Sequence, residues 1–141
     1  MKEMIKGLGH IGIAVRNMES AISNYQSSIG FEVLSITESK DMRVCMGKAG
    51  GIIVEFIEPI GNEGVIANFI NKRGEGVQHL CFEVDDIQEE LARLETEGDV
   101  GLIDKVPRRG VEGLIAFLHP KSTNGVLLEL LEKSEDHDAS R

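Results

Sequence analysis

The stretch that decides the fold is Gly74-Glu75-Gly76-Val77-Gln78-His79-Leu80-Cys81-Phe82-Glu83-Val84-Asp85-Asp86. From His79 to Val84, apolar residues alternate with polar or small ones, which is the period of a β-strand with one apolar face. The aspartate pair at its end is typical of a helix N-cap. The stretch therefore predicts a strand that begins near a histidine and leads into a helix.

The same design occurs earlier in the chain, as Gly7-Leu8-Gly9-His10-Ile11-Gly12-Ile13-Ala14-Val15. Arg16 and Asn17 follow it and precede another helical pattern. His10 and His79 hold equivalent places in the two stretches, so the chain contains one structural design twice. We expect both histidines to lie on the strand face opposite the aliphatic residues and to point into a cleft.

Each half is expected to contain a strand, a helix and three further strands. In the first half, periodicity and turn residues place these elements at Leu8–Val15, Met18–Ser28, Phe31–Glu38, Met42–Gly47 and Gly51–Glu58. A short helix over Val65–Lys72 follows. The second half is expected to hold a strand at His79–Val84, a helix from Ile87 to Gly98, and strands at about Leu102–Val106, Gly113–Leu118 and Val126–Leu131.

The predicted domain organisation follows from this order. Residues 1–60 form a first βαβββ module, 61–75 a connector with the short helix, 76–132 a second module and 133–141 a disordered tail. Two such modules predict an α+β protein whose curved mixed sheet surrounds a metal-binding cleft, with helices on its outer faces.

Composition excludes several classes of function. The 15 basic and 24 acidic residues give a formal net charge of -9, which argues against a broad nucleic-acid-binding or anionic-membrane surface. No apolar run approaches the roughly 20 residues that a membrane-spanning helix needs. Cys45 and Cys81 each stand alone in an expected strand, which favours a reduced, cytoplasmic protein.

Two glutamates complete a candidate metal site. Glu55 and Glu129 each stand in the middle of an otherwise apolar strand, and their spacing differs from that of the histidines by no more than a short insertion would absorb. A carboxylate in such a strand is costly unless it is paired or bound to a cation. Each residue alone has an ordinary structural explanation, but two histidines and two glutamates related by a repeat favour one shared cation. These ligands suit zinc, cobalt, nickel, manganese or iron.

In these residues the chain resembles the vicinal oxygen chelate superfamily, and within it the methylmalonyl-CoA epimerases, over about Leu8–Glu132. The superfamily pattern lies in His10–Val15, Tyr25, Gly30-Phe31, His79 and Glu129. The more specific epimerase-like runs are Ile57–Gly61, Lys72–Gly76, Phe82–Ile87 and Phe117-Leu118-His119-Pro120-Lys121-Ser122-Thr123-Asn124-Gly125-Val126-Leu127-Leu128-Glu129-Leu130.

The resemblance implies a metal-dependent enzyme that interconverts the (R) and (S) forms of methylmalonyl-CoA by removing the C2 proton through a metal-stabilised enolate. It carries the metal ligands onto His10, Glu55, His79 and Glu129. Our hypothesis for the mechanism is that Glu129, as a weakly held ligand, leaves the metal and acts as one catalytic base. It implies a divalent ion, Co2+ or Zn2+ ahead of Ni2+ or Mn2+. It further implies a homodimer and a coenzyme A thioester substrate.

Loop cations are candidates for binding the phosphates of coenzyme A. They are Lys72, Arg73, Arg108, Arg109 and Lys121, with Ser122 as a further substrate-binding candidate. Their alternative explanation is ordinary solvated surface charge. His119, which stands before Pro120, is expected to be structural.

Two positions depart from the epimerase pattern. Gln78 precedes His79 where many epimerases have a histidine pair, and Val44 stands where some members carry a second acid/base glutamate. On the sequence alone the second proton carrier stays open between Lys40, Glu38 and a water molecule.

Three other functions fit parts of the pattern. Glyoxalase I has similar ligands and also abstracts a proton next to a carbonyl, but it usually has an Asp-Pro-Asp-Gly type turn where this chain has His119-Pro120-Lys121-Ser122. A non-catalytic binding protein of the same fold often lacks a full ligand set. A ring-cleaving dioxygenase usually holds iron with two histidines and one carboxylate, so Glu55 counts against it.

Overall fold

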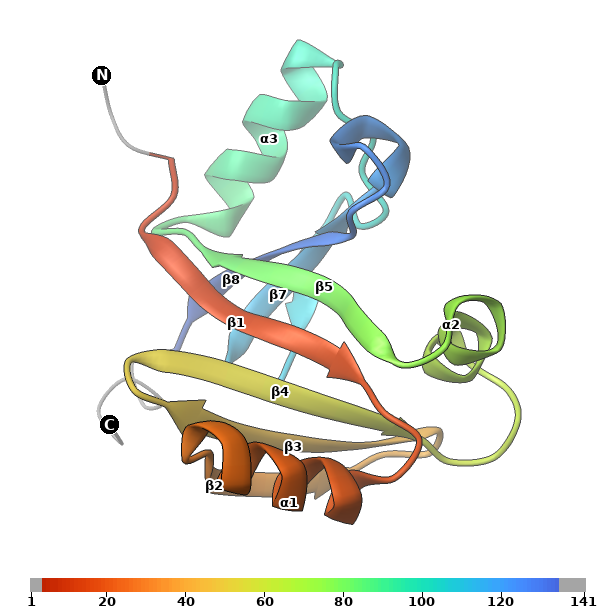
Figure 1. The fold of residues 1–141 in the computed structure, drawn as a ribbon. Coiled ribbons are helices and arrows are strands. Elements are labelled where there is room, and N and C mark those ends of the chain that lie inside the picture. The colour runs from red at the N-terminus through yellow and green to blue at the C-terminus, as the bar shows by residue number, and fades with distance from the viewer. Residues whose placement is uncertain (1–3, 135–141) are drawn as a thin grey trace. The chain divides into compact units, whose positions relative to one another are not determined.

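The computed structural model describes residues 4–134, and its elements follow one order twice (Figure 1). The first set is β1 (Gly7–Ala14), α1 (Met18–Ile29), β2 (Glu32–Glu38), β3 (Met42–Ala49) and β4 (Ile52–Pro59). Helix α2 (Val65–Arg73) leads to the second set, which is β5 (Gly76–Glu83), α3 (Ile87–Glu97), β6 (Arg108–Arg109), β7 (Gly113–Leu118), the short 3-10 helix η1 (Pro120–Thr123) and β8 (Leu128–Lys133). The predicted α+β fold of two βαβββ repeats is thereby confirmed.

The chain forms two compact units that divide inside β1 and β5. We call His10–Gln78 the His10 unit, and Met1–Gly9 together with His79–Arg141 the His79 unit. Strands of the His10 unit are ordered β2-β3-β4-β1, and those of the His79 unit β5-β8-β7-β6. In each unit one pair is parallel, β1 with β4 and β5 with β8, and the other pairs are antiparallel. The module boundaries at residues 60 and 76 stay a prediction. The expected tail at 133–141 begins too early, because Lys133 is the last residue of β8, and residues 135–141 lie outside the described residues.

Helix α1 begins and ends where the sequence predicts. The Asn17 side-chain oxygen accepts a 2.8 Å hydrogen bond from the Ser20 N–H, and Gly30 ends the helix in a left-handed conformation with φ of 70°. The helix buries Met18 and Ala21 in an apolar cluster completed by the buried side chains Val15, Phe31, Cys45, Val54 and Phe56. This cluster holds α1 against the strands (Figure 1).

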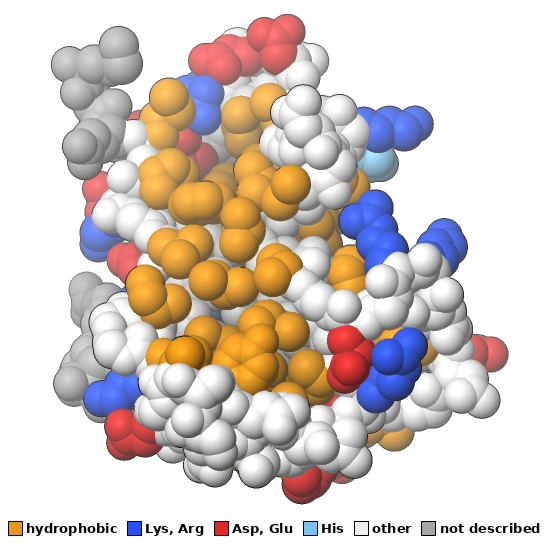
Figure 2. Space-filling view, in the orientation of Figure 1, with side chains coloured by type: hydrophobic (Ala, Val, Ile, Leu, Met, Phe, Trp, Pro, Cys, Tyr) orange, Lys and Arg blue, Asp and Glu red, His pale blue; other side chains and the backbone are white. Residues whose placement is uncertain are grey.

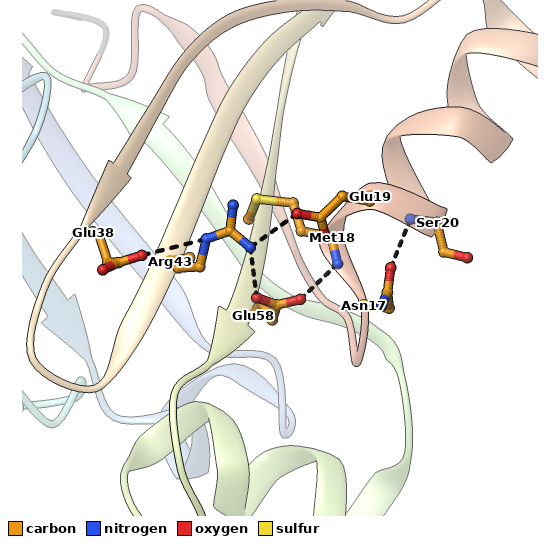
Figure 3. A network of polar contacts seen from close by, with 7 residues as sticks. All are labelled: Asn17, Met18, Glu19, Ser20, Glu38, Arg43 and Glu58. Atoms are coloured by element: carbon orange, nitrogen blue, oxygen red, sulfur yellow. Dashed lines mark hydrogen bonds and ion pairs between the residues drawn. The ribbon is translucent and has the colours of Figure 1, made fainter.

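A glutamate at the end of β4 also stabilises the start of α1. Glu58 accepts a 2.7 Å hydrogen bond from the Met18 N–H, one of the helix donors that have no partner within the helix. Arg43 lies 3.1 Å from the other Glu58 oxygen, 3.2 Å from Glu19 and 3.5 Å from Glu38 (Figure 3). The hydrogen bonds to Glu19 and then to Glu58 raise the pKa of Arg43. The network therefore fixes the start of α1 to strands β3 and β4.

The His79 unit repeats this construction. Asp86 caps α3 by accepting a 3.1 Å hydrogen bond from the Glu89 N–H, and Glu132 accepts a 3.0 Å hydrogen bond from the Ile87 N–H. Gly98 ends the helix with φ of 74°. The apolar cluster under α3 consists of the buried residues Val84, Ile87, Leu91, Leu94, Ala116, Leu118 and Leu130. Both helices therefore begin with a side-chain cap and a glutamate acceptor from a strand, and both end at a glycine.

The predicted strand at Leu102–Val106 is wrong. Only Leu102 forms an isolated bridge, with Leu118, and the following strand is the two-residue β6. The N–H groups of Ile103 and Asp104 both donate to the Phe117 carbonyl, at 3.0 and 3.2 Å, and the Asp104 carboxylate accepts a 2.8 Å hydrogen bond from the Phe117 N–H. A side chain thus takes the place that a paired strand would have filled.

Apolar side chains reach the surface in both units, and they are orange in Figure 2. Examples are Leu8 and Val106 in the His79 unit, and Ile52 and Val77 in the His10 unit. None of the helices in residues 4–134 is long and apolar enough to cross a membrane.

Candidate metal centre

The His10 unit holds one histidine–glutamate pair, with the histidine buried and the glutamate partly buried. Parallel pairing of β1 with β4 sets Gly12 beside Glu55, so the side chains of His10 and Glu55 project from the same face of the sheet. His10 Nε2 lies 3.6 Å from Glu55 Oε2, and the two side chains are 5% and 12% exposed. A carboxylate so far from solvent needs a compensating charge or hydrogen bonds.

The His79 unit holds the equivalent pair. Here β5 and β8 are parallel and set Cys81 beside Glu129, so the face that carries His79 and Cys81 also carries Glu129. His79 Nε2 lies 3.1 Å from Glu129 Oε1, and the side chains are 4% and 6% exposed. The two side chains of this pair therefore lie closer together and are less exposed to solvent than those of the His10 unit.

Strand register relates the two pairs as the sequence predicted. Gly12 and Cys81 are separated along the chain by the same offset as the two histidines, and their register partners are Glu55 and Glu129. The same relation recurs at the helix starts. Met18 and Ile87 are separated by the histidine offset, and the carboxylates that accept from their N–H groups, Glu58 and Glu132, are separated by the offset of Glu55 and Glu129. The repeat thus extends from the ligand face to the helix caps.

The donor types fit a divalent metal. His10, His79 and Glu129 are buried, and each offers one ligand atom. Imidazole nitrogen together with carboxylate oxygen is the donor set of zinc, cobalt, nickel, manganese and iron sites. The chemistry of these residues therefore agrees with the divalent ion expected from the sequence.

Val44 lies where a second acid/base glutamate was considered. Its side chain packs against the apolar cluster of Ala14, Ile57, Ile66 and Ile70 that seats helix α2. The position therefore serves packing and supplies no proton carrier.

The candidate substrate-binding residues lie in two places. Lys72 and Arg73 form the last turn of α2, and the Arg73 guanidinium lies 5.8 Å from the centre of the Phe69 ring. Lys121 and Ser122 lie in η1, where the Ser122 hydroxyl oxygen accepts a 2.8 Å hydrogen bond from the Gly101 N–H. His119 accepts a 3.1 Å hydrogen bond from the Lys121 N–H, which gives it the structural role expected of it.

Sequence reasoning missed the surroundings of His79. The Phe117 ring meets the imidazole edge to face, with centres 5.8 Å apart and planes at 84°. The Arg108 guanidinium lies over the same ring at 5.5 Å. The alternation of β7 puts Phe117 on the face of Ile115, but only the register with Glu129 places it beside the candidate ligands.

A pocket of about 440 Å³ lies on another face of the His10 unit. Its lining includes Arg16, Asn17, Tyr25 and Glu75, and Glu75 accepts a 2.7 Å hydrogen bond from the Arg16 N–H. Neither His10 nor Glu55 lines it. The pocket is therefore separate from the candidate ligands.

Comparisons with known proteins agree on one family. The sequence profile of the Glyoxalase/Bleomycin resistance protein/Dioxygenase superfamily matches residues 9–118. The mitochondrial methylmalonyl-CoA epimerase of Dictyostelium discoideum is 36% identical over 130 residues, which are 89% of this chain and 78% of that protein.

Solved structures agree with the sequence comparison. The methylmalonyl-CoA epimerase of Mycobacterium tuberculosis matches 99% of this chain and 95% of its own, with a TM-score of 0.89 and 32% identity. A methylmalonyl-CoA epimerase in complex with methylmalonyl-CoA and NH4+ matches 94% of this chain and 97% of its own, with a TM-score of 0.84 and 30% identity. With its repeated strands, helices and buried histidine–glutamate pairs, this chain belongs to the Glyoxalase/Bleomycin resistance protein/Dioxygenase superfamily.

Proposed function

We propose that this chain is a methylmalonyl-CoA epimerase, which interconverts the (R) and (S) forms of the thioester by moving the proton at C2. The observation that carries the proposal is the buried histidine–glutamate pair at equivalent positions of both repeats. The choice of substrate rests on relatives named methylmalonyl-CoA epimerase, which match most of the chain.

His10, Glu55, His79 and Glu129 would together hold one divalent ion, Co2+ or Zn2+ ahead of Ni2+ or Mn2+. When bound, the ion supplies Lewis-acid stabilisation for negative charge that develops on the thioester oxygen. The two imidazole nitrogens and the two carboxylates would form the donor set, and the carboxylates would offset the charge of the ion. Burial of His10, His79 and Glu129, and the low exposure of Glu55, would limit competition from water.

Glu129 is the proposed base that removes the C2 proton. That proton lies between the thioester carbonyl and the carboxylate. The thioester carbonyl acidifies it, so its removal leaves an enolate. Glu129 Oε1 lies 3.1 Å from His79 Nε2, in the less exposed of the two histidine–glutamate pairs. Inversion then needs a proton from the opposite face.

The orientation of β2 and β3 reduces the number of candidates for the second proton carrier. Glu38 is paired with Arg43 in strand register and forms an ion pair with it. Both side chains therefore lie on the sheet face that packs against α1, whereas Val44 lies on the opposite face. This argues against Glu38. Lys40, in the turn between these strands, and a water molecule are the remaining carriers.

Binding of coenzyme A would use polar side chains of two helices, α2 and η1. Lys72 and Arg73 end α2, while Lys121 and Ser122 lie in η1, and all four are exposed. The exposed apolar side chains are consistent with the proposed homodimer. The burial of the Cys45 and Cys81 side chains is compatible with the proposed reducing, cytoplasmic setting.

A two-substrate comparison tests the proposal. Metal-loaded protein is incubated in deuterated water with methylmalonyl-CoA, and in parallel with the hemithioacetal of a 2-oxoaldehyde and glutathione. We expect the C2 proton signal of methylmalonyl-CoA to disappear and no hydroxyacyl-glutathione to form, and proton NMR measures both. Turnover of the hemithioacetal alone would replace the epimerase with glyoxalase I chemistry, and turnover of neither would favour a binding protein.

A further inference from the structure

Arg108 lies on the ligand face of the His79 unit. It is paired with Ile115 across β6 and β7, and Ile115 and Phe117 share the strand face that meets Glu129 of β8. The next residue, Arg109, is paired with Leu114, whose side chain packs on the core under α3. Two neighbouring arginines therefore serve opposite faces of the same sheet.

Two contacts hold the Arg108 side chain in place. Its guanidinium lies over the Phe117 ring at 5.5 Å, and its Nε lies 3.3 Å from Asp104 Oδ1. Asp104 is itself fixed, because its other oxygen accepts the hydrogen bond from the Phe117 N–H. The ion pair with Asp104 uses Nε, so the two terminal nitrogens of Arg108 are outside this contact. Together they can bind a carboxylate in a bidentate manner.

The Phe117 ring connects this cation to the candidate ligands. The ring lies under the Arg108 guanidinium and is also in an edge-to-face arrangement with His79, whose Nε2 lies 3.1 Å from Glu129 Oε1. A positive charge one aromatic ring away from the reacting centre is too close to that centre for the phosphates of coenzyme A, since the long pantetheine arm separates them from the thioester. It is at the right place for a group attached to the reacting carbon.

We propose that Arg108 binds the free carboxylate of the acyl group and thereby selects malonyl-type thioesters. The inference rests on the proposed function and deepens it. The side chain is 56% exposed, so it contributes recognition of a bound anion without being needed to stabilise the core. The sequence offered Arg108 as a phosphate-binding cation, and the inference assigns it to the acyl group instead.

The test compares two ligands that differ in the free carboxylate. Isothermal titration calorimetry measures binding of methylmalonyl-CoA and of propionyl-CoA, which lacks that carboxylate, to metal-loaded wild type, R108Q, R108K and R109Q. We expect R108Q to weaken methylmalonyl-CoA binding about tenfold to a hundredfold, the range for loss of one charged hydrogen-bond pair, and to leave propionyl-CoA binding unchanged. R108K should recover part of the loss, because it keeps the charge without the bidentate geometry.

Arg109 provides the matched control, with the same charge one residue away on the other face. R109Q should leave the ratio of the two affinities as it is in wild type, because any contact of Arg109 with the coenzyme A phosphates is common to both thioesters. Equal weakening of both ligands in R108Q would overturn the inference in favour of phosphate binding, and an unchanged R108Q would overturn it outright. Wild type that binds neither thioester would refute the proposed function and the inference with it, whereas wild type that binds while R108Q behaves identically refutes only the inference.

Discussion

At the scale of single residues, Glu129 is assigned two roles that a substitution can separate. Glutamine keeps an oxygen that can bind a metal but cannot take up a proton. We therefore expect Glu129→Gln to retain most of its bound metal and to lose roughly 10²- to 10⁴-fold in C2 deuterium exchange, the usual contribution of a positioned base. Metal analysis together with proton NMR measures both quantities.

Glu55 is the matched comparison for Glu129, since it occupies the equivalent place in the other repeat. Glu55→Gln changes a proposed ligand that has no proposed proton-transfer role, so it should lose much less exchange activity than Glu129→Gln. Equal losses in the two variants would remove Glu129 from the role of base. A loss of metal from Glu129→Gln alone would make it a ligand only.

At the scale of elements, the sequence predicted the helices better than the last strands. The caps Asn17 and Asp86 are local signals, because each side chain bonds to a backbone N–H three residues on. The segment at Leu102–Val106 could not be predicted in this way, since Asp104 bonds to Phe117 across 13 residues. The contact of Arg108 with Phe117 was missed for the same reason, because strand register is a tertiary property.

The repeated helix caps give a stability prediction. Glu58→Ala and Glu132→Ala each leave the first N–H of a helix without its carboxylate acceptor, so each should lower the free energy of unfolding by about 1–2 kcal/mol. Chemical denaturation measures the change, with Glu63→Ala in an exposed loop as the control. If both cap variants unfold like the control, the carboxylates do not hold the helices.

At the scale of the whole molecule, the repeat allowed the candidate site to be predicted from sequence. The offset between the histidines and the offset between the glutamates both recur in strand register and at the helix caps, so the two histidine–glutamate pairs belong to one design used twice. Each pair supplies only two ligands, fewer than the three or four protein ligands of most zinc sites. This shortage is why we propose that both pairs serve a single ion.

The most direct test of this account titrates metal into chelator-treated protein while proton NMR follows deuterium uptake at C2 of methylmalonyl-CoA. We expect no uptake without metal, and uptake that rises in proportion to added Co2+ and reaches its plateau at one ion per chain. Uptake that continues undiminished in metal-free protein, or a plateau at two ions per chain, would contradict a single catalytic ion shared by the two repeats.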